Sequence, residues 1–150
     1  MNARLDAYET DPKTVKAIAT LSQTIAGSGL EGSLLELVKI RASQINNCAY
    51  CVDMHSRDAR RHGETEQRLY LVAVWRESSL FSARERAALA WTESLTLLAQ
   101  SQAPDQDYDE LTRHFSASEI VKLTAAIGMI NFWNRFGVGF RMQHPVDPAL

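Results

Sequence analysis

Cys48 and Cys51 are the only cysteines in the sequence, and they form one C-x-x-C motif that is followed by His55. Residues three and four apart lie on one face of a helix, so a helix here would gather the two thiols and the imidazole into one cluster. An amphipathic segment, 31–45, precedes the motif and carries Glu36 twelve residues before Cys48. The spacing therefore predicts a chemically reactive helix that begins close to Cys48.

The chemistry expected of this cluster is that of an activated thiol. A free cysteine has a pKa of about 8.5, and only its thiolate is nucleophilic. If Asn46 or Asn47 caps the helix, Cys48 lies in the first turn, where free N–H groups favour a negative charge. His55 lies one turn after Cys51 and could take the proton of that thiol. This way of forming a thiolate is more specific than the field of a helix N-terminus, because it supplies a base.

We therefore predict that Cys51 is the attacking thiolate and Cys48 the resolving thiol. An electrophilic oxygen would convert Cys51 to a sulfenic acid, and Cys48 would condense with it to a disulfide. An external dithiol would then reduce that disulfide.

Two other interpretations of the cysteine pair stay open at this point. The thiols could be small apolar core residues. They could also bind zinc with His55, and Glu36 or water would be the fourth ligand, although structural zinc sites typically draw their ligands from two separated pairs. Redox chemistry is the favoured interpretation, and we expect no bound metal and no cofactor.

Charge and composition exclude several classes of function. The 150 residues include 16 basic and 18 acidic side chains, for a net charge of −2, with no basic tail or acidic block. Binding to nucleic acid or to a membrane surface therefore has no electrostatic support. Residues 1–6 lack the apolar core of a signal peptide, and no apolar run approaches the ~20 residues that cross a bilayer. We expect a cytoplasmic protein, in which a C-x-x-C pair indicates redox or metal chemistry.

The apolar periodicity predicts an all-α protein with about six or seven helices in one domain over residues 1–150. The expected core is 12–135, with an irregular N-terminal arm at 1–10 and a tail at 136–150 that Gly137, Gly139, Pro145 and Pro148 interrupt. The expected helices are 12–26, 31–45, 48–62, 67–76, 82–98, 108–115 and 116–134. Start signals are the Asp11-Pro12 pair and the capping boxes Ser82/Glu85 and Ser116/Glu119.

The last long helix indicates that the protein is a homo-oligomer. Its apolar residues, together with Phe132 and Trp133, exceed what a subunit of this size can cover. Asn131 and Asn134 follow that apolar run and could lie buried at a subunit contact or cap the long helix.

The wider sequence around the motif resembles a known family. The spacing Glu36-x11-Cys48-x2-Cys51-x3-His55 is accompanied by the segments GET at 63–65, AVWRES at 73–78 and FSARERAAL at 81–89. Together they resemble the alkylhydroperoxidase D-like (AhpD-like) family within the carboxymuconolactone decarboxylase superfamily.

This resemblance implies an all-helical antioxidant fold, a CxxC peroxidase or disulfide reductase activity, and assembly into a trimer or hexamer. It also implies that Glu36 and His55 form a proton relay to Cys51. Characterised members carry a histidine at the position of Tyr50, whose phenol can donate a hydrogen bond but is no base near neutral pH.

Four functions are consistent with these observations. The first is a thiol peroxidase that reduces hydroperoxides and is regenerated by a dithiol. The second is disulfide exchange with a protein or lipoyl partner, without peroxide turnover. The third is the decarboxylase or lactone chemistry of the wider superfamily, which does not need the cysteines. The fourth is a non-enzymatic, oligomeric redox-sensing module.

Overall fold

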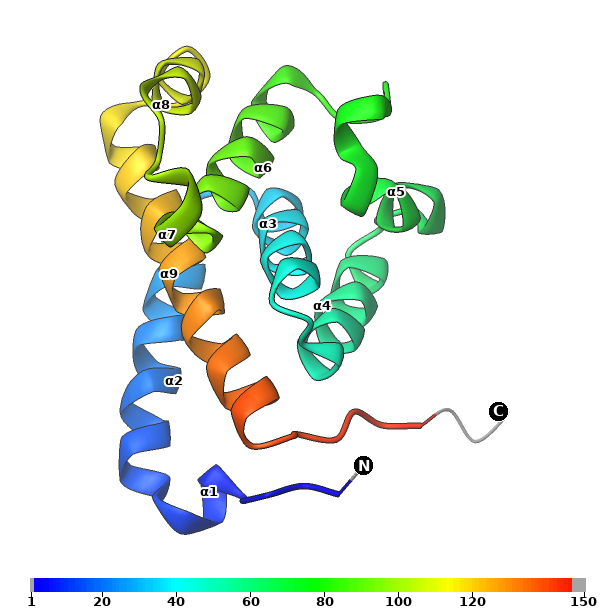
Figure 1. Cartoon of the computed structure of the whole chain (residues 1–150), viewed down its shortest axis with the longest axis vertical. Coiled ribbons are helices and arrows are strands. Elements are labelled where there is room, and N and C mark those ends of the chain that lie inside the picture. The colour runs from blue at the N-terminus through cyan, green and yellow to red at the C-terminus, as the bar shows by residue number, and fades with distance from the viewer. Residues whose placement is uncertain (1, 147–150) are drawn as a thin grey trace.

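The computed structural model describes residues 2–146, and the regular structure within them is helical throughout (Figure 1). No strand occurs in this part of the chain, so the all-α prediction is confirmed. The helices are α1 (Ala7–Thr10), α2 (Pro12–Ala26), α3 (Gly32–Ile45), α4 (Ala49–Arg61), α5 (Glu66–Leu71), the 3-10 helix η1 (Val72–Glu77), α6 (Ala83–Thr96), α7 (Leu98–Ser101), α8 (Asp105–Thr112) and α9 (Ala117–Gly139).

Side chains cap the helices at the predicted start signals. The carboxylate of Asp11 caps α2. Reciprocal capping boxes open α6, through Ser82 and Glu85, and α9, through Ser116 and Glu119. Each box satisfies backbone N–H groups that a helix start otherwise leaves without partners. These three helix starts were therefore readable from local sequence alone.

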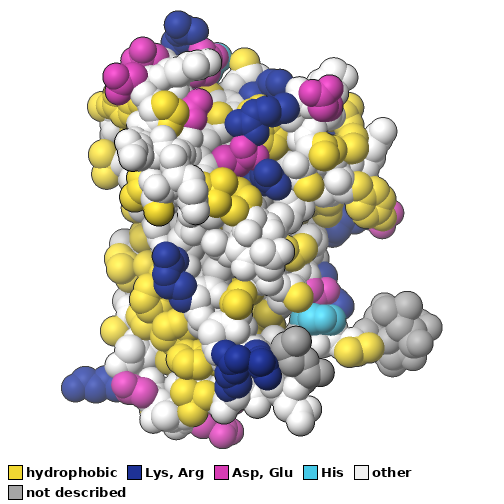
Figure 2. Space-filling model, in the orientation of Figure 1, with side chains coloured by type: hydrophobic (Ala, Val, Ile, Leu, Met, Phe, Trp, Pro, Cys, Tyr) yellow, Lys and Arg dark blue, Asp and Glu magenta, His cyan; other side chains and the backbone are white. Residues whose placement is uncertain are grey.

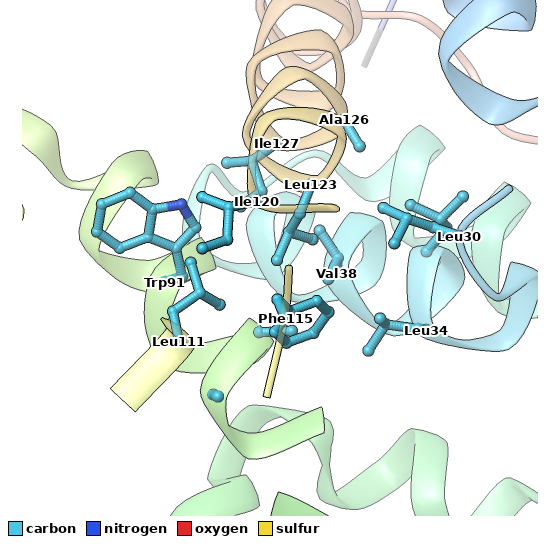
Figure 3. Close-up of a cluster of buried hydrophobic side chains, with 13 residues drawn as sticks. Leu30, Leu34, Val38, Trp91, Leu111, Phe115, Ile120, Leu123, Ala126 and Ile127 are labelled. Atoms are coloured by element: carbon cyan, nitrogen blue, oxygen red, sulfur yellow. The ribbon is translucent and has the colours of Figure 1, made fainter. Parts of the chain in front are cut away.

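The central element is α3, which packs against α4, α6 and α9. The largest cluster of buried apolar side chains joins α3 to α6, α8 and α9 (Figure 3). Its members are Leu30, Leu34, Leu35, Val38, Ala87, Ala88, Trp91, Leu111, Phe115, Ile120, Leu123, Ala126 and Ile127. Full burial of one large apolar side chain contributes roughly 1.5–3 kcal/mol. The cluster therefore fixes α9 against α3, and these two helices flank the cysteine motif.

Arg84 of α6 joins the beginnings of α3 and α9. Its guanidinium donates hydrogen bonds to Glu31 at 2.9 Å and to Glu119 at 2.6 Å. The backbone N–H of Ser116, followed by Arg84, lowers the pKa of the Glu119 carboxyl to about 2. A single arginine thus connects three helices at one end of the molecule.

The surface carries mixed charges. Figure 2 shows Lys and Arg side chains interspersed with Asp and Glu over one face, which agrees with the net charge of −2. Within residues 2–146, every helix is too short or too polar to cross a membrane.

Several expected elements have other bounds in the structure. The helix predicted at 108–115 is α8, Asp105–Thr112, and the N-terminal arm predicted to be irregular contains the short helix α1. The helix predicted at 67–76 is α5 followed by the 3-10 helix η1, with a kink at Val74. A 3-10 turn aligns residues i and i+3, and this arrangement buries both Val72 and Trp75. The helix predicted at 82–98 ends at Thr96, and the short α7 follows.

The last helix is longer than predicted. It continues past Asn134 to Gly139, so residues 136–139 belong to α9 and not to an irregular tail. Neither Gly137 nor Gly139 adopts a positive φ, so both are in ordinary helical backbone. Gly137 packs against the cysteine pair, where an added side chain would collide with a sulfur. Pro148, which was also expected to interrupt the tail, lies outside the described residues.

Candidate active site

The Cys48–Cys51 pair lies at the start of α4 and is joined by a disulfide. Cys48 is itself the N-cap residue, because its Sγ accepts the N–H of Cys51 at 3.3 Å. The expectation that an asparagine caps this helix is wrong: Asn46 ends α3, and Asn47 occupies the connecting turn with a φ of +56°. Asparagine tolerates this left-handed conformation better than most residues. A sulfur at the N-cap lies where the helix dipole stabilises a thiolate.

The structure brings the four predicted site residues together. Cys51 and His55 are buried on α4, with exposed fractions of 2% and 8%. Glu36 approaches from α3, and its Oε2 lies 2.8 Å from Nδ1 of His55. The other carboxylate oxygen accepts a hydrogen bond of 2.8 Å from Lys39, a residue outside the predicted site. The Glu36 carboxylate therefore contacts the ammonium group of Lys39 as well as the imidazole of His55.

Competing effects act on the Glu36 carboxyl. Burial works to raise its pKa, whereas the hydrogen bonds and positive charges of His55 and Lys39 lower it. The latter prevail and hold the pKa of Glu36 below its ordinary value of 4.5. Glu36 is thus a carboxylate at neutral pH, which suits a group that orients and stabilises a protonated imidazole.

A cavity of about 310 Å³ borders Cys51 and His55 but not Cys48. Its walls come mainly from apolar side chains of α2, α4 and α9, among them Ile25, Met54, Met129, Ile130 and Trp133. Tyr50 also lines the cavity. A small molecule in this cavity would therefore contact Cys51 and not Cys48.

A buried polar network ties α9 to the turn before Cys48. The amide of Asn46 donates to the side-chain oxygens of Asn131 and Asn134, both at 2.9 Å. Asn134 donates in turn to Ser43 at 2.9 Å. The two asparagines of α9 do not cap the helix, which continues to Gly139. Their location at a subunit contact stays a prediction. Their hydrogen bonds fix the α3–α4 turn that positions the disulfide.

Zinc binding by this cluster would require two free thiolates. Here the two sulfurs are bonded to each other. Among residues 2–146, no three side chains of His, Cys, Asp or Glu are placed to hold a metal ion.

Comparison with known sequences identifies the family. Residues 12–94, which include all four predicted site residues, match the Carboxymuconolactone decarboxylase family. The chain belongs to this family. This family member is 38% identical to the protein YdfG of Bacillus subtilis (strain 168) over 138 residues, which cover 92% of the chain and 94% of YdfG.

Solved structures agree with this assignment. The crystal structure of ATU0492 from Agrobacterium tumefaciens, for which a role as the antioxidant defence protein AhpD has been suggested, matches with a TM-score of 0.96. The two share 46% identity, and the match covers 97% of the chain and 100% of ATU0492. The debrominase Bmp8, at 23% identity, shares the fold with a TM-score of 0.80 over 94% of the chain and 76% of Bmp8. The family member described here is therefore AhpD-like.

Proposed function

We propose that this AhpD-like protein is a CxxC-dependent thiol peroxidase that reduces alkyl hydroperoxides or hydrogen peroxide. The proposal rests on one observation above all: Glu36 and His55 are hydrogen-bonded at 2.8 Å, and His55 borders the same cavity as Cys51. A base that is held by a carboxylate and lies one helical turn from a cysteine is an arrangement that activates a thiol. The disulfide partner of Cys51 is Cys48, which supplies the resolving thiol.

In the first step, His55 takes the proton of the Cys51 thiol, and the thiolate attacks the terminal oxygen of the hydroperoxide. The O–O bond breaks, and its reduction balances the two-electron oxidation of Cys51 to a sulfenic acid. The alkoxide leaves with the proton that His55 held and departs as an alcohol. Glu36 stabilises the positive charge on His55 between these two proton transfers.

In the second step, the Cys48 thiolate attacks the sulfur of Cys51 and forms the disulfide, and the departing hydroxide takes up a proton as water. A dithiol or a lipoyl protein then regenerates the enzyme. Its first thiolate attacks the sulfur of Cys51, the cysteine that borders the cavity, and Cys48 leaves as a thiolate at the helix N-cap. The second thiol of the reductant closes its own disulfide and releases Cys51.

A second candidate function is disulfide exchange with a protein or lipoyl partner, without peroxide turnover. The same observations favour it, because a buried disulfide with one cysteine bordering a cavity can react with a slender dithiol whether or not peroxide formed it. We also expect a homo-oligomer, a trimer or a hexamer. Exposed apolar side chains on α2 and α9, among them Leu21, Val121 and Val138, support that prediction.

The test is a thiol count on the reduced protein before and after one equivalent of cumene hydroperoxide, by denaturing alkylation and mass spectrometry. We expect the wild type to lose both thiols rapidly. In the Cys48→Ser variant, dimedone should trap a sulfenic acid at Cys51. In the matched Cys51→Ser variant, the Cys48 thiol should survive.

Survival of both thiols in the wild type would rule out the peroxidase and leave disulfide exchange, for which dihydrolipoamide is the probe. Wild-type peroxide turnover by Cys51→Ser with dithiothreitol would contradict the assigned roles. Superfamily decarboxylase or lactone chemistry would instead persist when both cysteines are replaced.

A further inference from the structure

Helix α9 approaches the disulfide closely at Gly137. A Cβ at this buried position would lie 2.4 Å from Sγ of Cys48 and 3.2 Å from Sγ of Cys51. Ordinary van der Waals contact between carbon and sulfur begins well beyond the first of these distances. Gly128, on the same helix, has open space where its Cβ would stand. Gly137 is therefore the glycine of α9 whose missing side chain is filled by a cysteine sulfur.

We propose that Gly137 is a positioning residue that sets the stability of the Cys48–Cys51 disulfide relative to the dithiol. Its relevance to turnover rests on the proposed function, but the equilibrium itself does not. With glycine, the Cys48 sulfur can occupy the space between α4 and α9 and still accept the N–H of Cys51. With any larger residue, either the sulfur or the helix must move.

The helix is not free to move away. One turn before Gly137, Asn134 donates to Ser43 and accepts from Asn46, so α9 is hydrogen-bonded to the C-terminal end of α3, just before the cysteine pair. Asn134 is 2% exposed, and retreat of α9 would leave these buried amides without partners. An added methyl group therefore presses on the Cys48 sulfur.

The oxidised and reduced forms respond differently to that pressure. In the dithiol, the Cys48 side chain can turn about χ1 into another staggered rotamer. In the disulfide, the bond to Cys51 fixes the sulfur and the clash persists. A side chain at position 137 therefore opposes disulfide formation and favours reduction. In that reduction, the Cys48–Cys51 disulfide reacts with two external thiols and gives the two cysteine thiols and one external disulfide.

The test is a redox titration of purified Gly137→Ala in glutathione buffers, read by alkylation and mass, with Gly128→Ala as the matched control. We expect the equilibrium constant for disulfide formation to fall at least tenfold in Gly137→Ala, which is about 30 mV in the reduction potential of this two-electron couple. The Gly128→Ala potential should equal that of the wild type. A Gly137→Ala constant within threefold of the wild-type value would overturn the proposal.

A double-mutant cycle keeps the proposal testable if oxidised Gly137→Ala folds poorly. In the Cys48→Ala background the clashing sulfur is absent, so Gly137→Ala should leave urea stability unchanged or raise it. Equal destabilisation by Gly137→Ala with and without the Cys48 sulfur would refute the sulfur contact as the cause. Neither measurement uses peroxide, so absence of peroxidase activity would not affect this result. Conversely, peroxide turnover with an unshifted potential would refute this inference alone.

Discussion

Replacing Glu36 by glutamine tests the relay because it removes one charge and almost no volume. The carboxylate accepts hydrogen bonds of 2.8 Å from His55 and from Lys39, and its side chain is only 12% exposed. A hydrogen bond to a charged group contributes about 1.5–3 kcal/mol, and a neutral one about half as much. Glu36→Gln should thus destabilise, by about 1–1.5 kcal/mol, the protonated imidazole that forms when His55 takes the Cys51 proton.

Because 1.36 kcal/mol is a factor of about ten in rate, we expect Glu36→Gln to slow oxidation of Cys51 about tenfold. The assay is the pseudo-first-order rate of sulfenic acid formation with cumene hydroperoxide, measured in the Cys48→Ser background so that resolution does not intervene. Glu110→Gln is the matched control. Glu110 contacts His114 at 3.1 Å on an exposed part of α8 and does not border the cavity.

The pH dependence of stability gives a second readout of the same substitution. The pKa of Glu36 is held below its ordinary value of 4.5, so its contribution is fully present above that value and is lost as the pH falls through the lowered pKa. The stability gap between wild type and Glu36→Gln in urea should therefore shrink from about pH 7 to about pH 3. An oxidation rate within twofold of wild type, or a loss equal to that of Glu110→Gln, would refute the relay.

Two further substitutions probe the framework of the site. Asn134→Ala should destabilise the protein by about 2–3 kcal/mol in urea unfolding, because Ser43 and Asn46 each lose a buried partner. A loss of stability below about 0.5 kcal/mol, the range of ordinary surface substitutions, would contradict this prediction. Glu93 accepts hydrogen bonds from Trp75 at 2.9 Å and from Arg41 at 2.7 Å. Burial works to raise the pKa of the Glu93 carboxyl, but these partners and the contact with Arg76 hold that pKa below 4.5. Glu93→Gln should therefore cost about 1–3 kcal/mol near neutral pH, and the deficit should vanish as acid protonates the wild-type carboxylate; a deficit independent of pH would show that charge is not the cause.

Local sequence determined the cysteine–histidine cluster and most of the helices. The spacing of Cys48, Cys51 and His55 needs only one helix to become a cluster, and capping boxes act within four residues of a helix start. Short-range rules of this kind depend on neighbours along the chain, so they can be read without knowing the fold. They also left errors where two local signals competed, as at the asparagines before Cys48, where the cysteine itself is the N-cap.

Contacts between distant helices were decided only by the tertiary structure. Glu36 could be placed in the site through family resemblance, but its bond to His55 depends on which faces of α3 and α4 meet. Gly137 looks in the sequence like a residue that ends a helix, because a glycine that breaks a helix and one that packs against a sulfur have the same local signature. Asn46 and Asn134 are 88 residues apart, and the burial that makes their hydrogen bond valuable is a property of the packed core. Periodicity fixes which side of a helix is apolar, whereas the partner of each side chain is fixed only when the helices pack.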